Sequence, residues 1–214
     1  MPAAIAQKKD QNFADEVRRL WTHARAALRD FALDDIDAAI RSREALLEGL
    51  VERYGKRLNE IEYNDFGGDC HEKPHAARVL VFSLLIGAAE ALPAEDLERL
   101  ALASVYHDSR RENDDLDTGH GMRASFYYAA QMREANVEPD ALVQHALAFH
   151  DLDDMLGCGL AVEPKKRLLT QIFKDADALD RYRFGTDALD MRFLRRAPSS
   201  ALARVARRLN GLDD

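Results

Sequence analysis

Histidines are unevenly placed in this chain of 214 residues, which contains seven of them. Six lie within residues 71–150: His71, His75, His107, His120, His145 and His150. Imidazole nitrogens ligate divalent metal ions and exchange protons near neutral pH. The clustering therefore indicates metal binding or acid–base chemistry in the middle of the chain. His23 lies outside the cluster and is expected to be an ordinary surface or packing residue.

The dipeptide His107-Asp108 ends a predicted helix over residues 97–108. At helical spacing the apolar residues share one face, with Asp108 at its centre and His107 at its edge. A carboxylate that points into a protein core costs free energy unless a cation or several hydrogen-bond donors meet it. The pair alone also suits an exposed helix C-terminus, so the choice between a buried site and an exposed helix end depends on other residues.

Two more histidines face inward on predicted helices. His150 lies within the apolar stripe of residues 139–150, and His75 aligns with apolar residues of the segment 74–91. His145 lies to one side of its stripe and is expected to have no role at a site. A single inward histidine is usually a hydrogen-bonded core residue. Three imidazoles and a carboxylate together are hard to satisfy without a metal ion, so the joint pattern favours a metal site.

Helical periodicity extends over almost the whole chain, and no segment alternates as a β-strand would. Proline fits the first turn of several of these segments. The predicted fold class is therefore all-α. The expected helices cover these residues: 11–30, 34–54, 74–91, 97–108, 120–134, 139–150, 164–180 and 199–209.

Composition excludes several classes of protein. Hydrophobic residues make up 47% and charged residues 32%, which is typical of a globular domain. The formal charge of −8 argues against nucleic acid as the main partner. The two cysteines form no CxxC pair, which indicates a reducing compartment. The most apolar run, residues 79–89, is too short to span a bilayer. We expect a cytoplasmic protein without a membrane segment.

Five motifs occur in a characteristic order within residues 71–182: HAARV at 75–79, YHDSRREND at 106–114, GHGMRAS at 119–125, LAFHD at 147–151 and KDADALDR at 174–181. This order resembles the HD-domain superfamily of metal-dependent phosphohydrolases. The resemblance implies an HD-domain helical bundle with extra N-terminal and C-terminal helices. The corresponding division of the chain is an N-terminal extension (1–60), an HD domain (61–190) and an Arg-rich C-terminal helix (191–214).

The resemblance also implies a set of metal ligands. By motif position, the ligands that define the family and the two extra histidines of its dinuclear members are these: His75, His107, Asp108 and Asp177, then His120 and His150. In dinuclear members the aspartate of the HD pair bridges both ions. His71 stands where some members carry another histidine in a loop. Asp177 is chosen by the motif, whereas helical periodicity alone places Asp180 nearest the apolar stripe.

These residue types suit one or two ions of Mn, Fe, Co, Ni or Zn. A bound ion of this kind makes hydroxide available near neutral pH, so the expected activity is hydrolysis of a phosphate ester in a small nucleotide or other phosphorylated metabolite. The expected catalytic residues are His107, Asp108 and His120. Cationic side chains near the motifs are expected to bind the phosphate: Arg110, Arg111, Lys73 and Lys174.

Two alternatives remain open at the level of sequence. An HD-type di-iron oxygenase uses the same ligand types, and a regulatory module could bind metal without turnover. The helices within residues 11–54 either pad the core or form the surface of a homodimer. The arginines of the C-terminal helix are expected to form a solvated face, with a phosphorylated substrate or an acidic partner as the other interpretations.

Overall fold

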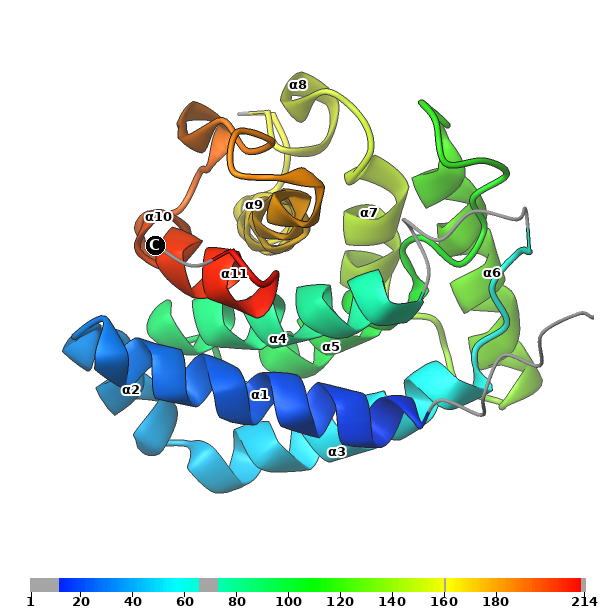
Figure 1. Ribbon diagram of the computed structural model, residues 1–214. Helices are drawn as coiled ribbons and strands as arrows, with labels where there is room; N and C mark the ends of the chain where they lie inside the picture. The colour runs from blue at the N-terminus through cyan, green and yellow to red at the C-terminus, as the bar shows by residue number, and fades with distance from the viewer. Residues whose placement is uncertain (1–11, 66–72, 160, 213–214) are drawn as a thin grey trace, which may run out of the picture.

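The computed structural model describes residues 12–65, 73–159 and 161–212. Within these ranges the chain is built of helices and short 3-10 turns and contains no β-strand, which confirms the all-α fold class (Figure 1). The elements have these bounds: α1 (Phe13–Asp30), α2 (Asp34–Arg41), α3 (Glu44–Glu60), α4 (Lys73–Ala89), α5 (Ala94–Tyr106), α6 (His120–Glu134), α7 (Ala141–Phe149), α8 (Asp154–Gly157), α9 (Pro164–Leu179), η1 (Asp180–Phe184), η2 (Met191–Phe193), α10 (Ala197–Ala201) and α11 (Ala203–Leu209).

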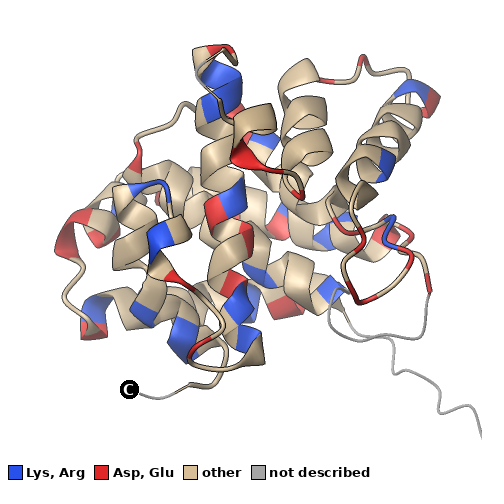
Figure 2. Cartoon of the chain, turned by 90° about the horizontal axis from the view of Figure 1, so that it is seen from above, with Lys and Arg blue, Asp and Glu red and all other residues tan. Residues whose placement is uncertain are grey.

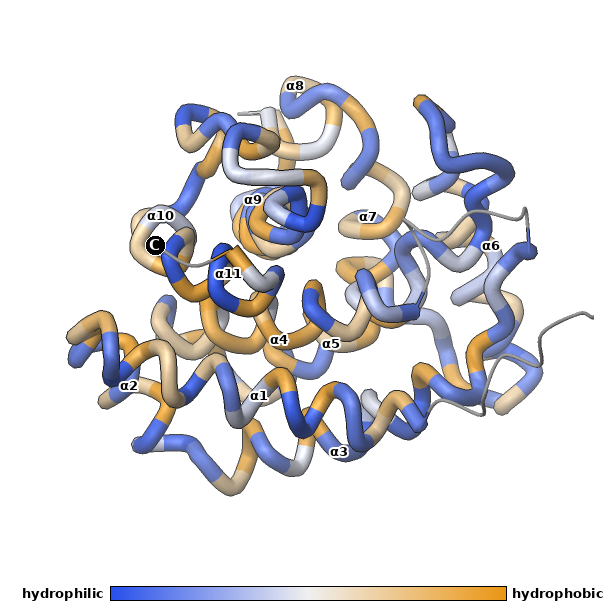
Figure 3. The backbone as a smooth tube through the Cα atoms, in the orientation of Figure 1, coloured by the Kyte–Doolittle hydropathy of each residue, from blue (hydrophilic) through white to orange (hydrophobic). Residues whose placement is uncertain are grey.

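Helix α4 forms the centre of the bundle. Between His75 and Ala88 only Arg78 is not buried, as expected for a helix that is apolar nearly all round. Helices α1, α5 and α9 pack against different sides of it, and the tube in Figure 3 shows its hydrophobic character. Burial on every side explains why α4 lacks the polar stripe of a surface helix.

Helix ends converge on one region beside this core. His75 lies in the first turn of α4, and His107 and His150 are the C-cap residues of α5 and α7. His120 is the first residue of α6, and Asp177 lies in the last turn of α9. Side chains far apart in sequence therefore meet because five helices begin or end at the same place.

Polar contacts fix α5 and α7 relative to each other. Asp140 caps α7 by accepting hydrogen bonds from the backbone amides of Leu142 and Val143. The guanidinium of Arg99 on α5 donates to Asp140 at 2.8 Å and to Asp96 at 2.6 Å. These contacts set the register of the two helices whose last residues lead into His107 and His150.

Two predicted helices are interrupted. The segment 34–54 was expected to be continuous, but α2 ends at Arg41 and α3 begins at Glu44. Between them, the side chain of Arg43 donates to the carbonyl of Leu92, which holds the turn against the loop after α4. The segment 199–209 likewise divides between α10 and α11 at Leu202.

The C-terminal arginines contact the chain itself. Arg204 and Arg208 each place the guanidinium carbon 4.1 Å from the ring centre of Phe31, at the end of α1. Arg196 pairs with Glu90 at 2.6 Å. Several arginines of the predicted solvated face therefore fasten the C-terminal segment to the bundle.

Figure 2 shows acidic and basic residues interspersed over the helices and loops. In the part of the chain that the structure describes, no helix has both the length and the hydrophobicity needed to cross a membrane.

Candidate metal centre

Three of the four inward histidines are oriented by their own local backbone. The Nδ1 atoms of His107, His120 and His150 lie 2.9, 2.7 and 2.7 Å from the carbonyl oxygens of the residues three positions earlier. A carbonyl oxygen only accepts, so each Nδ1 carries the hydrogen and each neutral ring has an unprotonated Nε2. Helix-end geometry alone therefore turns three ligand-type nitrogens towards a common centre.

The four histidines form two close pairs. Nε2 of His75 lies 3.0 Å from Nε2 of His107, and Nε2 of His120 lies 2.9 Å from Nε2 of His150. Two lone pairs at this separation repel unless a proton or a metal ion lies between them. Two nitrogens that each lie about 2.1 Å from one ion, and meet it at a right angle, are about 3.0 Å apart. The donor set therefore fits a metal ion at each pair.

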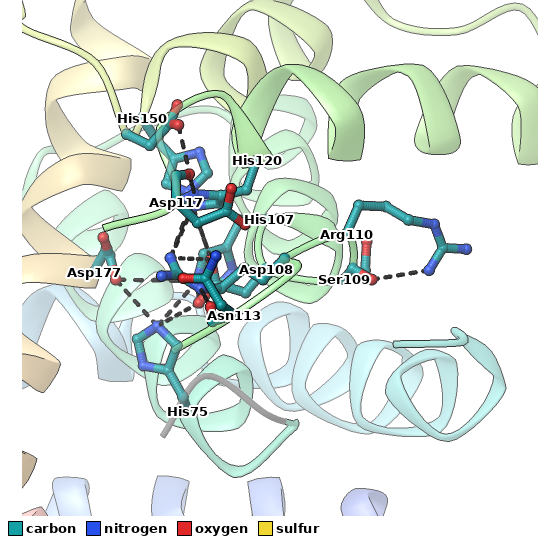
Figure 4. Close-up of polar contacts among 12 residues, drawn as sticks. His75, His107, Asp108, Ser109, Arg110, Asn113, Asp117, His120, His150 and Asp177 are labelled. Carbon is teal, nitrogen blue, oxygen red and sulfur yellow. Dashed lines mark hydrogen bonds and ion pairs between the residues drawn. The ribbon is translucent and has the colours of Figure 1, made fainter. Parts of the chain in front are cut away.

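Asp108 lies between the two pairs and offers one oxygen to each (Figure 4). Its Oδ2 is 3.6 Å from Nε2 of His75 and 3.6 Å from Nε2 of His107. Its Oδ1 is 3.0 Å from Nε2 of His120 and 3.8 Å from Nε2 of His150. Two buried groups that could hold a metal ion result, the first cluster (His75, His107, Asp108) and the second cluster (Asp108, His120, His150).

Asp177 and Asp180 occupy opposite sides of His75. Oδ1 of Asp177 lies 3.1 Å from Nε2 of His75 and 4.0 Å from Nε2 of His107, so Asp177 borders the first cluster. Oδ2 of Asp180 lies 2.6 Å from Nδ1 of His75, behind the ring. The motif thus identified the aspartate at Nε2 of His75, Asp177, and helical periodicity identified the aspartate at its Nδ1, Asp180. A supporting role for Asp180 was missed, although its position on the apolar stripe was a signal.

Burial and nearby charge shift the ionisation of these groups. Burial lowers the pKa of His107 to about 3, so this ring is neutral at pH 7. Burial and Arg183 lower the pKa of His75, but Asp177 and Asp180 outweigh them and the pKa is raised. Burial also acts against the charged form of Asp177, yet His75 keeps the pKa of this carboxyl well below its usual range. Metal ligands are ionised carboxylates and neutral imidazoles, so Asp177 and His107 are in their ligating states, and His75 binds a metal ion in its neutral form.

A cavity of about 750 Å³ opens over the centre. Asp108, His120, His150 and Asp177 line it, so the second cluster faces the cavity. Within the described residues, His75 and His107 are not part of its lining and lie deeper in the bundle. The centre thus has a buried side and a side that a small molecule can reach.

Two of the four predicted phosphate-binding residues lie at this cavity. Arg111 places Nη1 3.3 and 3.4 Å from the ring nitrogens of His120 and 3.8 Å from Oδ1 of Asp108. Lys174 lines the cavity with its Nζ 2.7 Å from Oδ1 of Asp154. Both cations therefore line the cavity into which an anionic molecule bound at the second cluster would extend.

The structure does not bring the other two predicted residues, Arg110 and Lys73, to the cavity. Arg110 points away from the centre in Figure 4, donates to the carbonyl of Glu62 at 2.6 Å and stacks 3.3 Å from the ring centre of Tyr127. Lys73 donates to the carbonyl of Asn59 at 3.1 Å. Nearness in sequence to a ligand did not decide the direction of either side chain.

Three further arginines line the cavity: Arg181, Arg183 and Arg195. Contact with a phosphorylated substrate was one interpretation of the C-terminal arginines, which include Arg195, whereas Arg181 and Arg183 were not anticipated. Arg181 and Arg183 belong to η1, and Arg195 precedes α10. The side chain of Arg183 is 11% exposed, and its Nη1 donates to the carbonyl of Asp180 at 3.0 Å. Arg181 is the last residue of the final motif, Arg183 follows shortly after it and Arg195 lies well beyond it, so no regular spacing marked the three.

The remaining histidines behave differently. Nε2 of His145 bonds the carbonyl of Gly157 at 3.0 Å, which ties α7 to α8 and keeps His145 out of both clusters. His71 lies outside the described residues.

Gly121 allows α6 and α7 to meet closely. A Cβ atom at this position would lie 2.3 Å from the carbonyl oxygen of Leu147 and 2.7 Å from Nδ1 of His150. Any larger residue would push the first turn of α6 away from the end of α7. The glycine therefore permits the contact between His120 and His150.

Comparison with known proteins identifies no relative: no family model matches the chain, and neither curated proteins nor solved structures match it. The fold and the two clusters are described by geometry alone.

Proposed function

We propose that this chain is an HD-domain, metal-dependent phosphohydrolase of the cytoplasm. The proposed substrate is a small nucleotide or other phosphorylated metabolite. The proposal combines the order of the five motifs with the two buried His/Asp clusters, which could hold one or two divalent transition-metal ions. The motif order is the source of the family assignment, and the clusters support the metal requirement.

The observation that carries the proposal is the position of Asp108. Its two oxygens face two histidine pairs, and all four rings turn their Nε2 atoms inward. Without a metal ion, these nitrogens are satisfied only where one ring of each pair takes up a second proton, and burial opposes that charge. A divalent ion removes this cost for the histidine pair that binds it, and one ion in each cluster removes it for both pairs.

The proposed roles follow from the distances. His75, His107, Asp108 and Asp177 would hold one ion, and Asp108, His120 and His150 would hold the other. When bound, such ions supply a water of lowered pKa and neutralise phosphoryl oxygens. Arg111, whose Nη1 lies beside His120 and Asp108, and Lys174 would orient the phosphate at the cavity side by their positive charge.

The same ligand types also serve di-iron oxygenases, and metal can bind to a module without turnover. Elemental analysis of the purified protein beside Asp108→Ala separates these functions. Two equivalents of metal in the wild type that are lost in the variant, together with hydrolysis of phosphate esters that a chelator abolishes, would support the proposal.

Other results would reject it. Iron that copurifies in an O₂-sensitive, light-absorbing site without phosphate hydrolysis would favour the oxygenase. Bound metal with neither activity would favour a regulatory module. Absence of metal even after reconstitution would reject the metal centre itself.

A further inference from the structure

His75 differs from the other inward histidines in how its ring is held. The other three rings donate from Nδ1 to a backbone carbonyl three residues earlier, which local helix geometry supplies. His75 instead faces a side chain 105 positions away, since its Nδ1 lies 2.6 Å from Oδ2 of Asp180. The orientation of His75 therefore depends on tertiary structure.

Asp180 is itself held by several donors. Arg78 donates from Nε to Oδ1 at 2.6 Å and from Nη2 to Oδ2 at 3.0 Å, which is a two-bond grip. Asn210 donates from Nδ2 to Oδ1 at 3.2 Å. The carboxylate is fully buried, so its position is set by these partners and not by solvent.

The contact with Asn210 extends this arrangement to the end of the chain. Asn210 is the C-cap residue of α11, and its side-chain amide also donates to the carbonyl of Ala206 at 3.0 Å. The amide is thus fixed to α11 on one side and to Asp180 on the other. A continuous path of hydrogen bonds runs from the C-terminal helix to a ring of the first cluster.

We propose that Asp180 is a positioning residue for metal binding: it holds His75 with Nε2 directed at Asp108 and Asp177, and Arg78 and Asn210 hold Asp180. The inference rests on the proposed metal centre but concerns residues outside the ligand set. A carboxylate behind a ligand imidazole fixes its tautomer and increases its basicity as a ligand. Loss of such a partner typically weakens metal affinity by about 10- to 100-fold.

The test compares two substitutions of the same kind on neighbouring residues. Asp180→Asn keeps the shape of the side chain and removes its charge. Asp175→Asn is the matched control, because Asp175 is also fully buried and is paired with an arginine, Arg195, at 2.9 Å. The probe is Co²⁺, titrated into the chelator-treated full chain and followed by its visible absorption. Thermal unfolding of each metal-free variant is measured in parallel.

We expect Asp180→Asn to weaken Co²⁺ binding by about 10- to 100-fold and to alter the absorption of the bound ion. Asp175→Asn should lower the unfolding temperature and leave Co²⁺ affinity within about threefold of wild type, since its hydrogen bonds reach no ligand. Equal affinity losses in the two variants, or no loss in either, would overturn the inference. A wild type that binds no Co²⁺ would instead overturn the proposed function.

Asn210→Ala tests whether the hydrogen bond from α11 to Asp180 contributes to metal binding. It also serves as the test of the positioning role of Asp180 if Asp180→Asn does not fold. This change removes one neutral donor and leaves Arg78 in place, so roughly a threefold loss of affinity is expected. Wild-type affinity in Asn210→Ala would remove α11 from the path. It would overturn the inference altogether if Asp180→Asn yields no folded protein.

Discussion

The first and second clusters share Asp108 but are built in different ways. In the first cluster the rings of His75 and His107 are almost fully buried, and the contact of His75 with Asp180 joins residues 105 positions apart in the sequence. In the second cluster the rings of His120 and His150 are held by nearby backbone and line the cavity. One cluster is enclosed by the core, and the other borders open space.

This difference separates two tasks that a binuclear site must perform. An enclosed set of ligands, with Asp177 as an additional carboxylate, favours retention of an ion. A set of fewer ligands beside a cavity leaves room for water and substrate. We therefore expect the first cluster to bind metal more tightly and the second to contact the substrate.

Asp108→Ala should have the largest effect, because Asp108 belongs to both clusters. We expect loss of both ions and a fall in hydrolysis of at least about a thousandfold, since each ion contributes several kcal/mol to transition-state stabilisation. Metal analysis and phosphate release measure the two effects. Asp108→Asn, which keeps the volume, controls for a packing defect. Two equivalents of metal retained in Asp108→Ala would refute the shared role.

His150→Ala should distinguish the clusters more selectively. Its ring belongs only to the second cluster, so metal content should fall from two equivalents to one. His145→Ala is the control on the same helix, because His145 contacts only Gly157 among the hydrogen bonds described for its ring. Metal loss in His145→Ala would mean that the wrong histidine of α7 was assigned.

Gly121→Ala should weaken the second cluster without replacing any of its proposed ligands. The added methyl group meets backbone and ligand atoms at 2.3 and 2.7 Å, so α6 must shift, at a cost of about 1–3 kcal/mol. We expect a lower unfolding temperature and weaker binding of the second equivalent of metal only.

Gly49→Ala provides the contrast, since a Cβ there meets nothing within 4 Å. This helix-interior change should raise stability by about 0.5–1 kcal/mol. Equal behaviour of the two alanine variants would show that the close approach at Gly121 has no consequence.

Residues within regular helices were predictable from sequence, because periodicity defines which side chains face inward. The burial of His75 in α4 followed from this rule alone. It also held for His107, Asp108 and His150, because His107 and His150 keep helical backbone angles as the C-cap residues of α5 and α7. His120 begins its helix, so no preceding turn marked its direction, and it was found only by its motif.

Residues beyond helix ends were not predictable in the same way. The loop after α5 has no repeating pattern, and its conformation depends on Arg111, which donates to the carbonyls of Asn113 and Asp115. Asp180 lies where α9 passes into a 3-10 turn, and its partner His75 is 105 positions away. Such contacts depend on tertiary packing, and they leave no periodic pattern of residues in the sequence from which they could be predicted.

Arg110 and Arg111 extend the comparison to adjacent residues, and Arg110→Ala should have the smallest effect of all. The guanidinium of Arg110 lies over Tyr127 and away from the cavity, so the KM for a phosphate ester should stay within about twofold of wild type. Arg111→Ala removes a cation 3.8 Å from Oδ1 of Asp108, and we expect kcat/KM to fall by about 10- to 100-fold. Steady-state kinetics of both variants on one substrate measure the contrast. Because the two residues have the same charge and adjacent positions, a larger loss in Arg110→Ala would place the substrate on the other side of α5 and reject the cavity as its site.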